Sequence, residues 1–221
     1  IEGNVVQGAN KITVGNGTGN LGKLSQSGGT FTGGSDTIWL NHSVFSLKGG
    51  TFTSTSSGFV FGIAQSFNPQ GAEPFVVNGG TFNHNNGTVY LRPSGNGAAT
   101  EAFTIPNGLT LNNCTIQGGA DTSAVSVPTG QVLTVAGTLT LTNGLLNSGT
   151  VNATALSTPI VHQSTFDGGT STIDIHGPQT VSLSTGNFTG LNVNNDNAVV
   201  NLPNIGGGTL TFGSGVTLQA G

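Results

Sequence analysis

The chain has 221 residues and a formal net charge of −4, and only 5% of its residues are charged, against about 25% in ordinary soluble domains. Its four bases, Lys11, Lys23, Lys48 and Arg92, are scattered along the sequence, so no basic patch favours nucleic acid as a partner. No apolar run approaches the roughly 18 residues of a membrane-spanning helix, so we expect no membrane insertion. The chain avoids charge but keeps β-forming residues, which distinguishes it from a typical disordered sequence.

The tetrapeptide Gly-Gly-Thr-Phe occurs three times in the first 82 residues, and each copy opens a short strand-like run. A turn, a Thr and a Phe that return at intervals of roughly 20–30 residues are typical of a solenoid. Side chains alternate between the two faces of a strand, so the Phe of each copy should point away from its Thr and Asn neighbours. We therefore predict a buried structural aromatic ladder on successive coils, formed by Phe31, Phe52 and Phe82.

The second half of the chain lacks the Gly-Gly-Thr-Phe copies but keeps the same alternation of short strand-like runs and turn signals. We therefore expect one continuous domain over residues 1–221. Two longer segments rich in Pro and Gly, Ala64–Pro74 and Arg92–Thr100, are predicted to project from it as loops. Aromatic residues exposed on such loops, for example Phe67 or Tyr90, would favour a binding function.

Short runs with period-two alternation continue to the end of the chain, separated by turn signals such as Asn86-Gly87, Asn143-Gly144 and Gly168-Gly169. Gly or Pro interrupts nearly every window of about ten residues, so almost no helix is expected. Such strands fit either an antiparallel sandwich or a parallel β-helix, and the recurring tetrapeptide favours the β-helix. The predicted fold is all-β, a single-stranded parallel β-helix (β-solenoid) of about 8–10 coils. Examples of predicted strands are Asp36–Leu40, Gln131–Val135, Thr138–Leu141, Thr172–Ile175, Thr180–Leu183, Gly190–Val193 and Thr209–Phe212.

The runs that begin at the second and third tetrapeptides, Gly49–Gly58 and Gly79–Val89, resemble units of large bacterial surface proteins. Those proteins are built from Gly/Thr/Asn-rich β-helical repeats of the adhesin and autotransporter-passenger type. The match covers about residues 28–91, and the rest of the chain resembles the class in composition and rhythm. The resemblance implies a protein that is extracellular or on the cell surface.

The closest pair of acids is Asp167 and Asp174, and two carboxylates can hydrolyse a glycoside when they lie about 5–9.5 Å apart. Asp167 precedes a Gly-Gly turn, whereas Asp174 lies in a strand between Ile173 and Ile175 and should point to solvent. No Lys or Arg is adjacent to either acid. We therefore expect no catalytic residue and no enzymatic activity.

Metal and cofactor sites are not expected either. The four histidines form no metal-spaced pair, and the Gly-Gly-x-Asp-Thr segments at Asp36 and Asp121 lack the middle glycine of calcium-binding β-roll repeats. The single cysteine, Cys114, is expected to act as a small buried hydrophobe.

Neither end of the sequence has the features of a solenoid cap, since Ile1–Val14 alternates like a strand and Gly208–Ala220 resembles another coil. We therefore expect copies of the chain to contact one another head to tail and to form a structural filament. The leading alternative is an adhesin module that binds glycans or a cell surface.

A further alternative is ice binding by rows of outward threonines. The pairs Thr30/Thr32 and Thr51/Thr53 would stack on neighbouring coils, and Asn83 would interrupt the row at its third step. Threonine is also a common outward residue of ordinary strands.

Overall fold

The computed structural model describes residues 1–15, 22–62, 74–93, 103–119, 123–156, 160–163 and 165–176, together with five later strands. The described part contains 26 strands and no helix, so no helix in it is long and apolar enough to cross a membrane. All pairings between these strands are parallel. The chain is thus an all-β parallel β-solenoid, as the sequence predicts.

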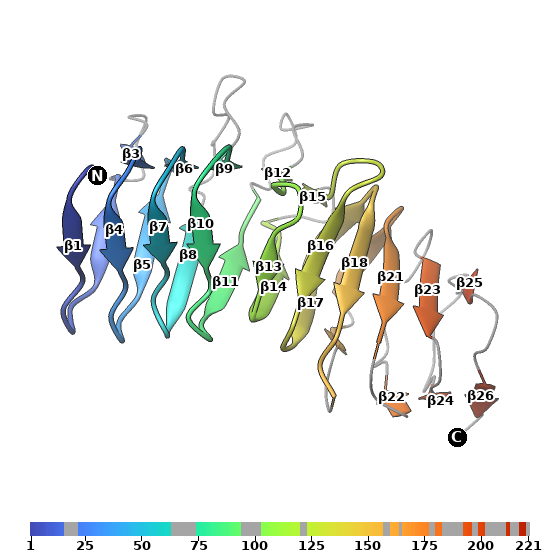
Figure 1. The fold of residues 1–221 in the computed structure, drawn as a ribbon. Coiled ribbons are helices and arrows are strands. Elements are labelled where there is room, and N and C mark those ends of the chain that lie inside the picture. The colour runs from blue at the N-terminus through green and yellow to red at the C-terminus, as the bar shows by residue number, and fades with distance from the viewer. Residues whose placement is uncertain are drawn as a thin grey trace.

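In the first coils, one turn of the chain forms three strands that lie on three faces of the rod (Figure 1). The front sheet consists of β1 (Asn4–Val6), β4 (Thr30–Thr32), β7 (Thr51–Thr53) and β10 (Thr81–Asn83). The back sheet consists of β2 (Ile12–Val14), β5 (Ile38–Asn41), β8 (Gly58–Gly62), β11 (Thr88–Leu91), β14 (Asn113–Gln117) and β17 (Leu139–Asn147). The third face carries β3 (Gly22–Gln26), β6 (Ser43–Leu47) and β9 (Phe75–Val77).

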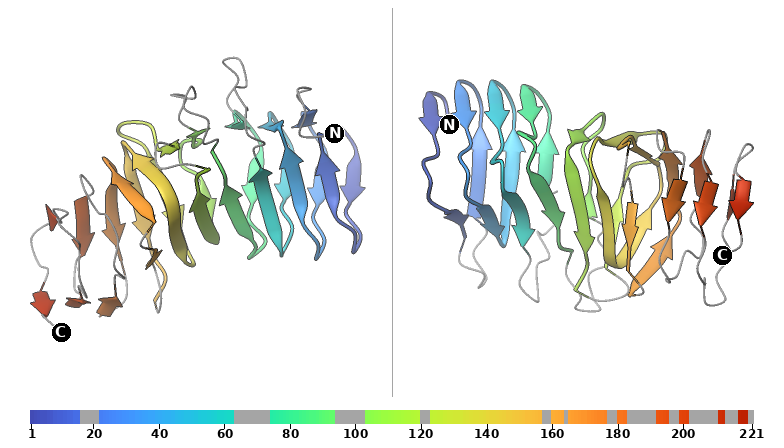
Figure 2. Two further views of the ribbon diagram at one scale, coloured as in Figure 1. Left: turned by 180° about the vertical axis from the view of Figure 1, so that it is seen from behind. Right: turned by 90° about the horizontal axis from the view of Figure 1, so that it is seen from below.

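The same winding continues toward the C-terminus (Figure 2). One uninterrupted sheet stacks six successive turns through β13 (Thr110–Leu111), β16 (Val132–Val135), β18 (Thr150–Ala153), β21 (Thr172–Ile175), β23 (Asn192–Asn195) and β25 (Thr211–Phe212). Beyond β17, the back sheet continues with β19 (Ile160–His162). The remaining strands are β12 (Phe103–Thr104), β15 (Ala124–Ser126), β20 (Phe166–Gly169), β22 (Thr180–Ser182), β24 (Val199–Asn201) and β26 (Thr217–Gln219).

The registers of paired strands show that the coils differ in length. Val132 pairs with Thr150, 18 positions further on, whereas Thr51 pairs with Thr81, 30 positions further on. Both predicted loops fall largely outside the described residues, and Phe67 lies outside them as well.

Two of the predicted turns are wrong. Asn143-Gly144 lies inside β17, and Gly168-Gly169 lies inside β20, so neither pair ends its strand. Gly144 has a φ of 94°, and the backbone N–H of Gly144 donates a 3.1 Å hydrogen bond to the Asp167 carboxylate. A positive φ lets glycine bend the strand at a corner while its neighbours remain paired to the next coil.

Phenylalanine fills the interior of the first coils. The ring of Phe45 on β6 lies 4.7 Å from that of Phe52 on β7 and 5.3 Å from that of Phe59 on β8, in both cases edge to face. These rings come from the three different faces, so aromatic contacts join all three sheets around one core. Further along, smaller side chains replace phenylalanine, among them Leu111, Leu133, Leu141, Leu146 and Ile173.

The three phenylalanines of the repeated tetrapeptide stack in register on the inner side of the front sheet. The rings of Phe31 and Phe52 lie 4.6 Å apart and nearly parallel, and those of Phe52 and Phe82 lie 5.9 Å apart. Phe31 and Phe52 are buried, but Phe82 is only partly buried, contrary to the prediction. β10 is the last strand of the front sheet, so no following strand of that sheet covers Phe82.

Cys114 lies on β14 and is completely buried, in agreement with its expected role as a small hydrophobe. Burial disfavours the charged thiolate and raises the pKa of the Cys114 thiol to about 12. The thiol is therefore an inert part of the core in the folded protein.

Candidate functional site

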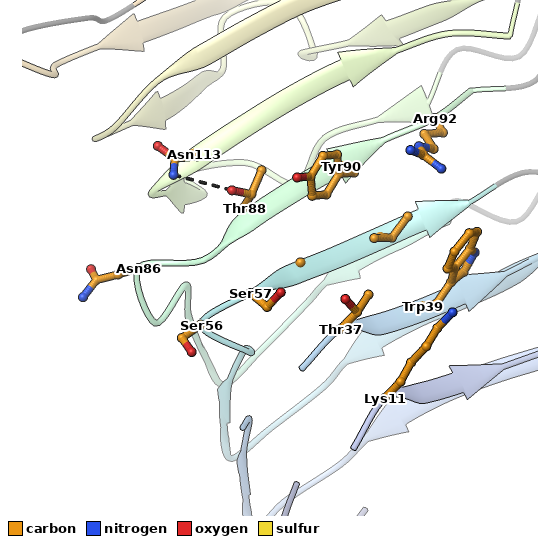
Figure 3. Close-up of a pocket in the computed structure, with 12 residues that line it drawn as sticks. Lys11, Thr37, Trp39, Ser56, Ser57, Asn86, Thr88, Tyr90, Arg92 and Asn113 are labelled. Carbon is orange, nitrogen blue, oxygen red and sulfur yellow. Dashed lines mark hydrogen bonds between the residues drawn. The ribbon is translucent and has the colours of Figure 1, made fainter. Parts of the chain in front are cut away.

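A groove of about 490 Å³ lies on the outer surface of the back sheet (Figure 3). This volume is within the range of about 300–1,000 Å³ that is usual for ligand sites. The residues that line the groove come from five neighbouring coils, from Lys11, just before β2, to Asn113 on β14. Its walls contain Trp39 and Tyr90, which are the single tryptophan and the single tyrosine of the chain.

Strand alternation explains why these two aromatic side chains point outward. Trp39 stands between Ile38 and Leu40, which are both completely buried, and the same alternation holds for Tyr90 on β11. The large apolar neighbours on each strand face the core. Alternation then places the amphipathic ring on the outer side of the strand. Tyr90 was expected on a projecting loop, but it lies in β11, a strand of the back sheet.

The floor of the groove is β8, whose sequence is Gly-Phe-Val-Phe-Gly. Phe59 and Phe61 point inward and are buried, so the outward positions belong to Gly58, Val60 and Gly62. In the sheet register, Val60 pairs with Trp39 on one side and with Tyr90 on the other. Since neighbouring strands are about 4.8 Å apart, the two aromatic residues stand about 10 Å apart across this floor.

The two glycines of β8 fit beneath the aromatic rings. A Cβ atom added at Gly62 would lie 2.3 Å from Nε1 of Trp39, and one added at Gly58 would lie 3.2 Å from Cε2 of Tyr90. Glycine inside a strand costs about 0.5–1 kcal/mol relative to alanine. Here glycine gives each ring room to lean over β8, Trp39 toward Gly62 and Tyr90 toward Gly58.

Two cations contact the aromatic walls (Figure 3). The Nζ of Lys11 lies 4.1 Å from the centre of the Trp39 ring. The guanidinium carbon of Arg92 lies 5.9 Å from the centre of Trp39 and 5.8 Å from that of Tyr90. At these distances each cation is attracted to the negative face of a ring, which holds its charge at the edge of the groove.

The end of the groove away from Arg92 is polar and uncharged. Asn113 on β14 donates a long 3.5 Å hydrogen bond to the hydroxyl of Thr88, and its carbonyl oxygen accepts from the backbone N–H of Thr138. These bonds hold the amide in place beside the groove. The remaining polar lining residues, which offer hydroxyl and amide groups, are Thr37, Ser56, Ser57 and Asn86.

The two acids that the sequence places closest do not share a face. Asp167 lies on β20 and its carboxylate accepts the hydrogen bond from Gly144 at the corner of β17. Asp174 lies on β21 between the buried Ile173 and Ile175, and its side chain is partly exposed, as predicted from alternation. Neither acid is among the residues that line the groove.

No group of three or more His, Cys, Asp or Glu side chains that could hold a metal ion is found among the described residues. His84 lies in the turn before β11, where its Nδ1 accepts a 3.0 Å hydrogen bond from the backbone N–H of Asn86. Partial burial lowers the pKa of His84, because it disfavours the charged imidazolium. His84 therefore acts through Nδ1 as a hydrogen-bond acceptor within the turn.

The threonines of the front sheet do stack in register. Thr30 pairs with Thr51 and Thr51 with Thr81, while the neighbouring row continues from Thr53 to Asn83. The second row therefore ends in an amide at its third step, as the sequence indicates.

The sequence alone missed most of the groove. It treats Lys11 and Arg92 as scattered bases, yet the fold brings both to Trp39 although they are 81 positions apart in the chain. One signal was present: Trp39 and Tyr90 occupy outward, partly exposed positions of alternating strands, where a large aromatic ring is unusual.

No protein-family model, no curated protein and no solved structure matches this chain. The functional assignment therefore depends on the groove itself: two aromatic walls, a flat floor of glycine and valine, two cations, and neutral hydrogen-bonding groups.

Proposed function

We propose that this protein is an extracellular surface solenoid that binds polysaccharide in the groove between Trp39 and Tyr90. The observation that carries the proposal is the position of these two residues. The only tryptophan and the only tyrosine of the chain both point outward and stand on opposite sides of the same glycine-containing strand.

The groove has the groups that a sugar chain needs. The C–H faces of a sugar ring carry small positive partial charges and pack against the negative faces of aromatic rings. Hydroxyl groups at the sugar's edges can bond to neutral amides and hydroxyls such as Asn113 and Thr37. A long open floor across several coils suits an extended polymer better than a compact small molecule.

The residues that line the groove also favour binding of a polysaccharide without its cleavage. Glycoside hydrolysis ordinarily uses two carboxyl groups that flank the scissile bond. None of the 12 described residues that line the groove is Asp or Glu. We therefore propose an adhesin-like binding module and not an enzyme.

Trp39 provides a direct test, because all tryptophan fluorescence of the protein comes from the groove. Titration with a panel of soluble plant and bacterial polysaccharides should change the emission of Trp39 saturably for at least one of them. The same polysaccharide should retard the protein in affinity electrophoresis and should keep its chain length during incubation. Unchanged emission and mobility with the whole panel would overturn the proposal, and shortening of the polysaccharide would overturn its non-enzymatic part.

Self-assembly into a filament is a second candidate function, favoured by the first coil. In the described part of the chain, β1, β2 and β3 each pair with a strand on one side only. Val5 and Val6 on β1 are also exposed, by 40% and 74%. A sheet edge of this kind is a template for pairing with another chain.

Head-to-tail assembly would be mostly apolar and hydrogen-bonded, so it should resist high salt. Light scattering and electron microscopy of the purified 221-residue chain should show polymers in both dilute and high-salt buffer. Val6→Lys should shorten them, because a charge on an edge strand opposes pairing. A protein that stays monomeric in both buffers is incompatible with this assembly.

A further inference from the structure

The charge of the groove has the opposite sign to that of the whole protein. The chain has twice as many acids as bases, 8 against 4, yet the described lining of the groove contains two bases, Lys11 and Arg92, and no acid. Resting on the proposed polysaccharide binding, we infer that the groove selects acidic polysaccharides whose sugar rings carry carboxylates, namely polymers of uronic acids.

The positions of the two cations support this inference. The Nζ of Lys11 lies 4.1 Å from the centre of the Trp39 ring, and the guanidinium carbon of Arg92 lies 5.9 Å from the same centre. The two atoms are therefore no more than 10.0 Å from each other. This separation is comparable to the Debye length of about 8 Å at physiological salt, so each cation is still repelled by the other. A carboxylate bound between or beside them would relieve this repulsion.

Arg92 is also poorly solvated. Its Nε is buried and has no hydrogen-bond partner, and its guanidinium carbon lies near both aromatic rings. A partly desolvated guanidinium gains more from a bound anion than one in open water, since the surrounding low dielectric strengthens the interaction. Arginine also matches the planar geometry of a carboxylate through two parallel hydrogen bonds.

The aromatic walls distinguish a uronic acid polymer from other polyanions. Trp39 and Tyr90 can pack against sugar rings while the cations pair with ring carboxylates, so both features act on one ligand. A polyanion without rings would use only the cations. A nucleic acid would require many phosphate contacts, and the chain has only four bases in all.

The test compares polygalacturonate and alginate with their methyl esters, which keep the sugar backbone but lose the charge. Trp39 emission and affinity electrophoresis should show binding of the acids at least about tenfold tighter than binding of the esters, as expected for one charge-assisted contact. Binding of the acids should weaken between 0.01 M and 1 M salt, because the Debye length falls from about 30 Å to about 3 Å.

Matched charge variants separate the groove from the net charge of the protein. Lys11→Gln combined with Arg92→Gln should reduce the affinity for polygalacturonate at least about tenfold. Lys23→Gln combined with Lys48→Gln also removes two positive charges, but at residues that do not line the groove. This second pair should leave the affinity within about twofold of the parent protein.

The outcomes also separate this inference from the proposed function. Equal binding of the acids and their esters, with no effect of the Lys11/Arg92 pair, would overturn the acidic selectivity but retain polysaccharide binding. Loss of affinity in both charge pairs alike would overturn the assignment to the groove. Binding of polyglutamate or of oligodeoxythymidine as tight as that of polygalacturonate would overturn the selectivity for uronic acids, and a failure to bind any polysaccharide would overturn both proposals.

Discussion

Replacing Trp39 by alanine should strongly weaken polysaccharide binding while the protein remains folded. Trp39 points outward from β5, contacts Lys11 and stands across β8 from Tyr90. Aromatic residues at the centre of a binding site typically contribute about 2 kcal/mol or more, which is about 30-fold in affinity. Calorimetry or affinity electrophoresis measures this loss, since the variant has no tryptophan emission.

Three further variants make this expectation specific. Tyr90→Ala should weaken binding in the same way, whereas Tyr90→Phe keeps the ring and should bind nearly as well as the parent protein. Leu156→Ala removes an apolar side chain that is 82% exposed and does not line the groove, so it should have no effect. Full affinity in Trp39→Ala, with circular dichroism unchanged, would show that the groove is not the binding site.

Replacing Phe52 by alanine should strongly destabilise the protein. Phe52 is completely buried, and its ring lies within 6 Å of those of Phe31, Phe45, Phe59 and Phe82. Removing a large buried aromatic side chain typically costs about 3–5 kcal/mol, because burial is lost and a cavity remains. Urea unfolding followed by circular dichroism should show this loss in the free energy of unfolding.

Phe82→Ala is the matched comparison, because Phe82 belongs to the same stack but is only partly buried. Its replacement should lower the free energy of unfolding clearly less than the replacement of Phe52 does, since less apolar surface returns to water. Neither change reaches the outward face of the back sheet, so any folded fraction should keep its groove. A similar loss of stability in both variants would contradict the idea that burial by neighbouring coils sets the strength of the stack.

The strands and their inward faces were largely predictable from local sequence. The run Thr172–Ile175 is β21 as predicted, and its Ile173 and Ile175 are buried while Asp174 is partly exposed. Alternation decides this, because a strand with apolar residues at every second position can bury only one face. The stacking of Phe31 on Phe52 follows from the same rule once the repeated tetrapeptides are paired.

Other features were not predictable from local sequence. Asn143-Gly144 has the composition of a turn, but pairing on both sides keeps it within β17. Tyr90 was expected on a loop, but it lies in β11 between β8 and β14. At Asn143-Gly144, hydrogen bonds to neighbouring coils outweighed the local turn preference, whereas the β-forming residues around Tyr90 favour the strand that is found.

The sequence by itself therefore determined the class of the fold, the absence of helix from the described part and the side of each strand that faces the core. Only the tertiary structure decided which outward residues meet. Coils of 18 to 30 residues place Lys11, Trp39, Val60 and Tyr90 next to one another although no fixed interval separates them in the chain. Burial is encoded residue by residue through hydrophobic alternation, whereas a surface groove depends on the register between coils, which the whole stack of hydrogen bonds sets.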